Sequence, residues 1–292
     1  MNHVASVKDR LKNLSVASGK TMQELFVAYA LERTIYRLSI SKYVGNFVLK
    51  GGIFLYAVFE GNYTRATTDI DLLAVHTSND IESVKSIFAE IFALEADDPL
   101  RFDLDTLQVT GITEFKDYHG VNVSIVAFLD RTKINVSIDI GFGDVVYPGR
   151  IEMDFPVVLS EKNPRVYAYS LASCVAEKFE AIVSLGYDNS RFKDFYDIYS
   201  LATTHDFDGT ELSKAIKETF EHRHTSTDDI AAFEVGFSDD PVRQSRWSSF
   251  VKKKRAMTPV TMEQTIELIK VFITPVIVGT NRRWSHETRE WL

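Results

Sequence analysis

The sequence predicts an α+β protein, with a mixed β-sheet in the first half of the chain and an α-helical lobe after it. Segments rich in β-branched residues alternate with amphipathic helices up to about residue 165. From Ser170 onward, apolar residues recur at helical spacing instead. We therefore predict a first domain with N-terminal helices over residues 1–165 and an α-helical domain over residues 166–292.

The elements of the first half follow from the spacing of apolar residues and from glycine breaks. Apolar side chains that recur every three or four positions predict helices, and short β-branched runs predict strands. In chain order we expect a helix over 20–41, a strand over 47–49 that ends at Lys50-Gly51-Gly52, a helix over 53–59, a strand over 68–75 and a helix over 79–94.

Three further β-rich segments indicate a meander of largely antiparallel strands. They cover residues 104–110, 121–129 and 134–140, with glycine and charged residues between them. Pro148 and Pro156 mark the end of this region. The second half then predicts helices over 171–186, 192–199, 210–222, 242–256 and 261–273.

Composition limits the class of protein. The 292 residues are 45% hydrophobic, and 33 basic against 41 acidic residues give a net charge of −8. An acidic chain argues against a general nucleic-acid coat protein. The single cysteine, Cys174, allows no internal disulfide and is expected in the core. No signal peptide and no apolar run of about 18 residues is present, so we expect a soluble, cytoplasmic protein that does not use a membrane.

Three acids lie in strand-like surroundings. Asp69 and Asp71 are two residues apart, so on a strand they project from one face, about 6–7 Å apart. Asp139 lies on the β-branched segment 134–140. Semi-buried carboxylates repel each other without a cation, and Mg²⁺ prefers such oxygen ligands. If the strands are neighbours, the three acids predict one or two metal ions, Mg²⁺ or alternatively Mn²⁺.

A glycine turn precedes these acids. Gly51-Gly52 follows one predicted strand and opens a helix, so its backbone amides could receive phosphate groups, assisted by Lys50 or Arg65. Each feature has a simpler explanation. Asp69 could be a solvated acid, Gly51-Gly52 a packing turn and Asp139 a strand terminator.

Five motifs in order resemble the AbiEii family within the polymerase-β-like nucleotidyltransferase superfamily. They cover roughly residues 45–200: Lys50-Gly51-Gly52, Thr68-Asp69-Ile70-Asp71 after Arg65, Asp139-Ile-Gly-Phe-Gly-Asp144, Glu177-Lys178-Phe-Glu, and Arg191-Phe-Lys-Asp194-Phe-Tyr-Asp197. Many superfamily members have Gly-Ser at the glycine pair, so here amides would replace a serine hydroxyl.

The resemblance implies more than the spacing does. It implies a nucleotidyltransferase toxin of a type IV toxin–antitoxin or phage-abortive system, with a polymerase-β-like core and a helical C-terminal lobe. An NTP would be the donor, the tRNA 3′ end the acceptor, and a cognate antitoxin a partner. Lys178 matches a lysine expected to contact nucleotide phosphates, and Asp194 an acid expected to support catalysis.

Both helical residues have structural alternatives. Lys178 lies on an otherwise apolar helix face, so it needs a phosphate, an acid or a route to water. Asp194 and Asp197 share one helix face and could stabilise the first turn of that helix.

A basic segment near residue 250 predicts an RNA-binding surface. It has six cations and interleaved Trp247 and Phe250, which could contact phosphates and bases; an ordinary solvated helix face is the alternative. The cations are Arg243, Arg246, Lys252, Lys253, Lys254 and Arg255.

Three functional hypotheses follow. The first is transfer of a nucleotide from an NTP to RNA, blocking translation. The second keeps this chemistry but modifies a protein hydroxyl. The third is a binding module without catalysis.

Overall fold

The computed structural model describes residues 3–62, 67–113, 119–159, 162–253 and 260–292. By its contacts, the chain divides into two compact units. Unit 1 comprises Met1–Gly143 and Ile151–Ala168, and unit 2 comprises Asp144–Arg150 and Tyr169–Leu292. The division into folding domains over residues 1–165 and 166–292 stays a prediction.

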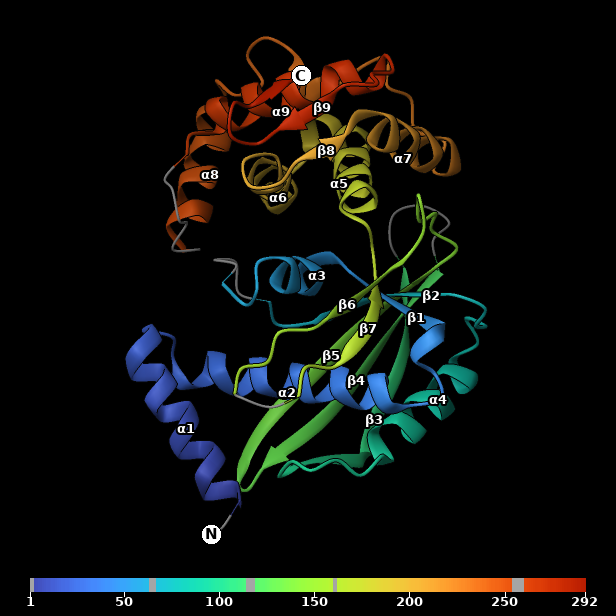
Figure 1. Cartoon of the computed structure of the whole chain (residues 1–292), viewed down its shortest axis with the longest axis vertical. Coiled ribbons are helices and arrows are strands. Elements are labelled where there is room, and N and C mark those ends of the chain that lie inside the picture. Colours follow the sequence, from blue (N-terminus) through green and yellow to red (C-terminus); the bar gives the residue numbers. More distant parts are fainter. Residues whose placement is uncertain (1–2, 63–66, 114–118, 160–161, 254–259) are drawn as a thin grey trace. The chain divides into compact units, whose positions relative to one another are not determined.

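Unit 1 is built on a mixed seven-stranded sheet (Figure 1) with the order β3-β4-β5-β2-β1-β7-β6. The pairs β3–β4, β4–β5, β1–β2 and β6–β7 are antiparallel, while β2–β5 and β1–β7 are parallel. The predicted α+β class with a mixed sheet is confirmed. The strands are β1 (Phe47–Lys50), β2 (Ile70–Ala74), β3 (Leu100–Thr113), β4 (His119–Leu129), β5 (Thr132–Phe142), β6 (Ile151–Asp154) and β7 (Arg165–Ala168).

The two faces of the sheet differ in character. Along β4 and β5 a buried apolar residue alternates with a half-buried or exposed one. Helices α2 and α4 contact each other as well as the sheet, so they cover its apolar face. The helices of unit 1 are α1 (His3–Ser18), α2 (Met22–Ile40), α3 (Gly51–Val58) and α4 (Ile81–Ala93).

Helix α2 begins at a capping box that the sequence contains. The Thr21 side chain accepts from the Glu24 amide, and the Glu24 carboxylate accepts from the Thr21 amide. A buried ion-pair network then fixes α2 to the start of β3, because Arg33 and Arg37 both bind Asp98 at 2.9–3.0 Å. Helix α1 and the short strands β6 and β7 were not predicted as separate elements.

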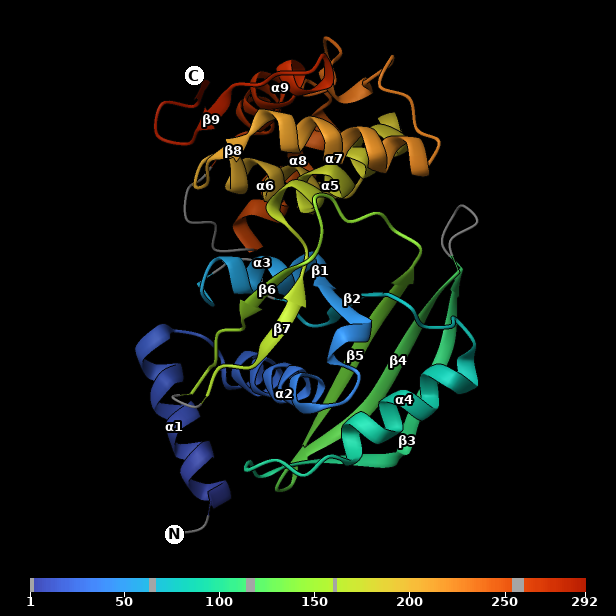
Figure 2. The same cartoon turned by 45° about the vertical axis from the view of Figure 1, so that its right-hand side comes forward.

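Unit 2 consists mainly of helices (Figure 2), as predicted. Helix α5 contacts α6 and α7, and α9 contacts both of them as well. Its long helices are α5 (Leu171–Leu185), α6 (Phe192–Ala202), α7 (Gly209–His222), α8 (Pro241–Lys253) and α9 (Met262–Ile277), with short 3₁₀ turns at Gly186–Asp188 and Ala231–Phe233.

A small sheet in unit 2 is an addition to the predicted helices. It has the order β10-β9-β8 and is formed by β8 (Phe207–Asp208), β9 (Arg283–Ser285) and β10 (Glu290–Trp291). Trp284 anchors it, since its indole is fully buried and donates to the Ala202 carbonyl at 2.7 Å. Strands of two or three residues are too short to show alternation, which explains why the sequence pattern did not predict them.

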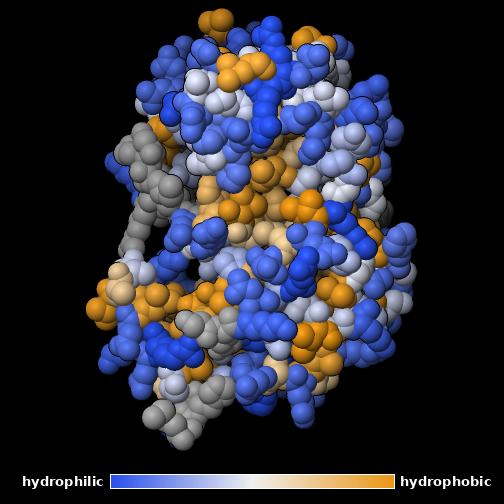
Figure 3. Space-filling model, in the orientation of Figure 1, coloured by the Kyte–Doolittle hydropathy of each residue, from blue (hydrophilic) through white to orange (hydrophobic). Residues whose placement is uncertain are grey.

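Figure 3 shows one face of the surface. On this face the outer part of unit 2 is mostly hydrophilic, and hydrophobic side chains gather in the middle of the view. Within the described residues, no helix is both long and apolar enough to cross a membrane.

Candidate metal and nucleotide site

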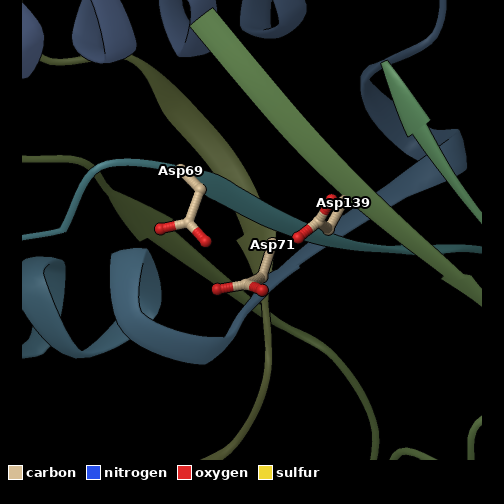
Figure 4. Close-up of side chains that lie close together, drawn as sticks. All are labelled: Asp69, Asp71 and Asp139. Carbon is tan, nitrogen blue, oxygen red and sulfur yellow. The ribbon is translucent and has the colours of Figure 1, made fainter. Parts of the chain in front are cut away.

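Two of the three predicted acids lie side by side on neighbouring strands. Asp71 on β2 and Asp139 on β5 are register partners in a parallel pair, so their side chains leave the same face of the sheet. Asp69 lies at a bend one residue before β2 rather than within the strand. Figure 4 shows the three carboxylates converging above the sheet.

The acids are close enough to share a metal ion. Each carboxylate offers one oxygen, these oxygens all lie within 4.8 Å of one another, and all three residues are half-buried. Oxygens that bind one Mg²⁺ at about 2.1 Å lie roughly 3–4 Å apart, so small side-chain rotations complete the geometry. The cluster can therefore hold a divalent metal ion, with three hard oxygen donors supplied by the chain.

The glycine turn is fitted to Asp71. Gly51 has φ of +62°, and a Cβ built there would lie 2.1 Å from Oδ2 of Asp71. The Gly52 amide donates to the same oxygen at 3.1 Å. The first turn of α3 thus binds the carboxylate of Asp71 through a backbone amide. Contact of Gly51 and Gly52 with phosphate stays a prediction.

Lys50 and Arg65 are the two cations predicted to assist phosphate binding at this turn, and the structure describes only Lys50. Lys50, the last residue of β1, is half-buried and lies opposite Asp71 in the β1–β2 register. This places its side chain on the same face as Asp71. Arg65 falls outside the residues that the structure describes.

Asn122 is a site residue that the sequence analysis missed. Its Nδ2 donates to Oδ1 of Asp139 at 2.6 Å and to Oγ of Ser137 at 2.8 Å. A signal for it was present. The two-residue turn Asp130-Arg131 closes the β4–β5 hairpin, and counting back from that turn places Asn122 opposite Asp139.

In unit 2, Lys178 and Asp194 do meet. The Lys178 ammonium lies 3.1 Å from Asp194 and 2.5 Å from Asp197, and its side chain is only 9% exposed. Arg191 binds the other oxygen of Asp194 at 2.8 Å. Of the alternatives for Lys178, the structure shows pairing with acids; its contact with nucleotide phosphate stays a prediction.

A second ion-pair cluster explains other residues of the motifs. Arg223, at the end of α7, binds Asp144 at 2.9 Å, Glu177 at 3.0 Å and Glu180 at 2.8 Å. Arg223 therefore ties the 144–150 segment of unit 2 to helix α5. This arginine lies outside the motif segments, and nothing in its sequence surroundings marked it.

The comparison with protein families decides the identity. The family model described as "Nucleotidyl transferase AbiEii toxin, Type IV TA system" matches residues 33–267. The chain belongs to this family. The predicted resemblance is confirmed, and the AbiEii assignment makes the chain a nucleotidyltransferase toxin, with a nucleotide donor and an antitoxin as its implied partners.

Other comparisons show more distant similarity. JHP933 from Helicobacter pylori is 15% identical, with 88% of this chain and 92% of that chain covered and a TM-score of 0.46. A second H. pylori protein, provisionally assigned as a nucleotidyltransferase, is 16% identical, with 85% and 92% covered and a TM-score of 0.43. A search of curated proteins found no match.

Arg243 of the predicted basic surface is largely buried in this AbiEii protein. Only 9% of Arg243 is exposed; it donates to the carbonyls of Phe237 and Tyr187 at 2.6 and 2.9 Å and lies 3.8 Å from the Phe237 ring centre. Trp247 is buried as well, and its indole donates to the Val260 carbonyl. Both residues therefore contribute to the packing of unit 2, and the RNA contact of Arg243 stays a prediction.

The rest of the basic segment is only partly visible. Arg246 and Lys252 are exposed on α8, and Phe250 is half-buried. Lys253 ends the helix, but its side chain is not among the described ones; Lys254 and Arg255 fall outside the described residues. For the two exposed cations, Arg246 and Lys252, contact with RNA stays a prediction.

Proposed function

We propose that this AbiEii protein transfers a nucleoside monophosphate from an NTP to an RNA hydroxyl, with the tRNA 3′ end as acceptor, and thereby blocks translation. One observation carries the proposal. Three carboxylates of a nucleotidyltransferase-family chain converge within 4.8 Å of one another beside the first turn of α3. The RNA acceptor is inferred from the family resemblance.

In this proposal Asp69, Asp71 and Asp139 hold Mg²⁺, with Mn²⁺ as the alternative ion. When bound, the metal would neutralise phosphate charge and activate the acceptor hydroxyl. The carboxylates can hold the metal ion because they offer hard oxygen ligands from one face of the sheet. The Gly52 amide holds Asp71 in place through its hydrogen bond.

The reaction is an in-line displacement at the α-phosphorus of the NTP. The acceptor oxygen forms a new bond to this phosphorus, the bond to the bridging oxygen of the β-phosphate breaks, and pyrophosphate leaves. The proton of the acceptor hydroxyl passes to water as the new bond forms. Lys50, on the same face as Asp71, is placed to offset phosphate charge; Lys178 and Asp194 keep the roles that the resemblance implies.

The proposed partners follow from this chemistry. An NTP donates the nucleotide, tRNA receives it, and a cognate antitoxin counteracts the toxin. Arg246 and Lys252 are the exposed cations we assign to RNA contact. We expect the reaction to take place in the cytoplasm, where NTPs and tRNA are both available.

The test is incubation of the purified protein with each of four α-³²P-labelled NTPs, Mg²⁺ and total tRNA. Asp69→Ala runs beside the wild type. Asp105→Ala is the matched control, because Asp105 is an exposed acid on β3 of the same sheet. We expect label in tRNA with the wild type and with Asp105→Ala, but not with Asp69→Ala.

Other outcomes would change the proposal. Label that resists ribonuclease but disappears with protease would identify a protein acceptor. No incorporation with any NTP, into RNA or protein, would leave a nucleotide-binding module and overturn the enzymatic proposal.

A further inference from the structure

The carboxylate of Asp139 is held by a neighbouring strand. We infer that Asn122 is a positioning residue that orients Asp139 for metal binding. The inference rests on the proposed function, since it assumes that the acid cluster binds a metal ion.

A row of polar residues crosses the sheet at this level. Lys50, Asp71, Asp139, Asn122 and Thr110 are successive register partners on β1, β2, β5, β4 and β3. Register partners project from the same face, so Asn122 lies beside the acids. Its neighbours along β4, Val121 and Val123, are buried on the opposite face.

The side-chain amide of Asn122 has two acceptors. Its Nδ2 donates to Oδ1 of Asp139 at 2.6 Å and to Oγ of Ser137 at 2.8 Å. Ser137 and Asp139 are two residues apart on β5, so both project toward the amide from one strand. The side chain of Asn122 therefore has one arrangement that uses both donors, and this arrangement fixes the carboxylate.

A neutral donor suits a metal ligand. A lysine or arginine in place of Asn122 would bring a positive charge to the carboxylate and compete with a cation. The amide carries no charge, and each carboxylate oxygen can accept more than one contact. Groups of this kind that orient metal ligands typically change metal affinity or activity by about 10–100-fold when removed.

The experiment measures Mn²⁺ binding by the purified full chain, using electron paramagnetic resonance of free Mn²⁺. Asn122→Leu removes the donor at similar volume, and Asn122→Ala is a smaller second variant. Asn135→Leu is the matched control, because Asn135 is an exposed asparagine four residues from Asp139 on the same face of β5. Thermal melting without metal checks that each variant is folded.

We expect Asn122→Leu and Asn122→Ala to bind Mn²⁺ at least about tenfold more weakly than the wild type, with Asn135→Leu unchanged. If the variants transfer nucleotide, raising the Mn²⁺ concentration should restore their rate, since the defect lies in metal affinity. A purely structural role would lower the melting temperature without this recovery.

The outcomes separate the two proposals. Wild-type binding with equal binding by a folded Asn122 variant would overturn the role of Asn122 and leave the proposed function intact. No Mn²⁺ binding by the wild type would overturn both. If the wild type binds Mn²⁺ but transfers no nucleotide, only the proposed function is overturned. The Mn²⁺ dissociation constants of the wild type and the Asn122 variants would still decide the role of Asn122.

Discussion

The backbone of Gly51 lies against the carboxylate of Asp71. A Cβ at position 51 would be 2.1 Å from Oδ2, 2.5 Å from Cγ and 2.8 Å from Cβ of Asp71. Gly51 also has a positive φ of +62°, which favours glycine. The glycine therefore serves both the backbone turn and the close approach of one acid of the cluster.

Gly51→Ala should displace Asp71 and weaken metal binding. The positive φ alone costs roughly 1–2 kcal/mol in a residue with a Cβ, and the collision must move the carboxylate. Gly279→Ala is the control, since Gly279 has φ of +85° and, beyond its chain neighbours, no described residue has an atom within 4 Å of a built Cβ. Urea denaturation should show a loss of about 1–2 kcal/mol for Gly279→Ala and a larger loss for Gly51→Ala because of the added collision, and only Gly51→Ala should bind Mn²⁺ more weakly. Unchanged Mn²⁺ binding by Gly51→Ala would contradict this account.

Asp139→Asn should separate metal binding from stability. Asp71 and Asp139 are like charges at register positions, which is destabilising by roughly 0.2–1 kcal/mol. The asparagine oxygen can still accept from Asn122. We therefore expect the metal-free variant to be as stable as the wild type or slightly more so, but to lose the rise in melting temperature that Mn²⁺ gives the wild type. A large loss of metal-free stability would instead assign Asp139 a structural role.

Much of the acid cluster could be predicted from local pattern. The β-branched segments around Asp71 and Asp139 predict strands, and alternation predicts the face on which each acid lies. The contact between the two acids could not be predicted in the same way. It depends on the parallel pairing of β2 with β5, strands that are separated in the chain by α4, β3 and β4. The prediction that Asp71 and Asp139 lie close together depended on the assumption that their strands are neighbours, which the family resemblance supports.

Burial of charged residues was the least predictable feature. Arg243 looks like its basic neighbours in the sequence, yet it binds carbonyls at Tyr187 and Phe237. One of these partners is 56 residues away, so no local pattern indicates it. Arg223 likewise gathers three acids from two other segments of unit 2. Contacts between segments distant in the sequence determine the burial and the partners of both arginines. The periodicity of apolar residues carries no information on such contacts.

Lys178→Met should destabilise unit 2 strongly. It would remove the cation shared by the buried carboxylates of Asp194 and Asp197, and removing one partner of a buried ion pair costs up to about 3–5 kcal/mol. Arg191 still pairs with Asp194 and offsets part of this loss. Lys193→Met is the control, because Lys193 is exposed on α6 and such changes stay within about 0.5 kcal/mol. Chemical denaturation measures both. Adding Asp194→Asn and Asp197→Asn to Lys178→Met should recover part of the loss. A stable Lys178→Met variant that no longer binds NTP would favour a purely phosphate-binding role.

Cys174 gives a pH-dependent prediction with a defined sign. Burial raises the pKa of its thiol from the usual 9.0 to about 12. Above pH 9 the unfolded chain therefore releases this proton while the folded chain keeps it. The contribution of Cys174 to stability should be complete below pH 9 and decrease by up to about 1.4 kcal/mol per pH unit between pH 9 and pH 12. The measurement is the free energy of unfolding of wild type minus that of Cys174→Ala, since subtraction removes the titration of other groups.

The same burial predicts the reactivity of the thiol. Only the thiolate reacts with a disulfide reagent, and Cys174 is the single cysteine of the chain. At pH 8 the native protein should therefore react far more slowly than the protein in denaturant, and the native rate should follow the fraction of unfolded chain. Rapid labelling of the native protein at pH 8 would show that Cys174 is accessible, and the pH dependence of stability should then be absent as well.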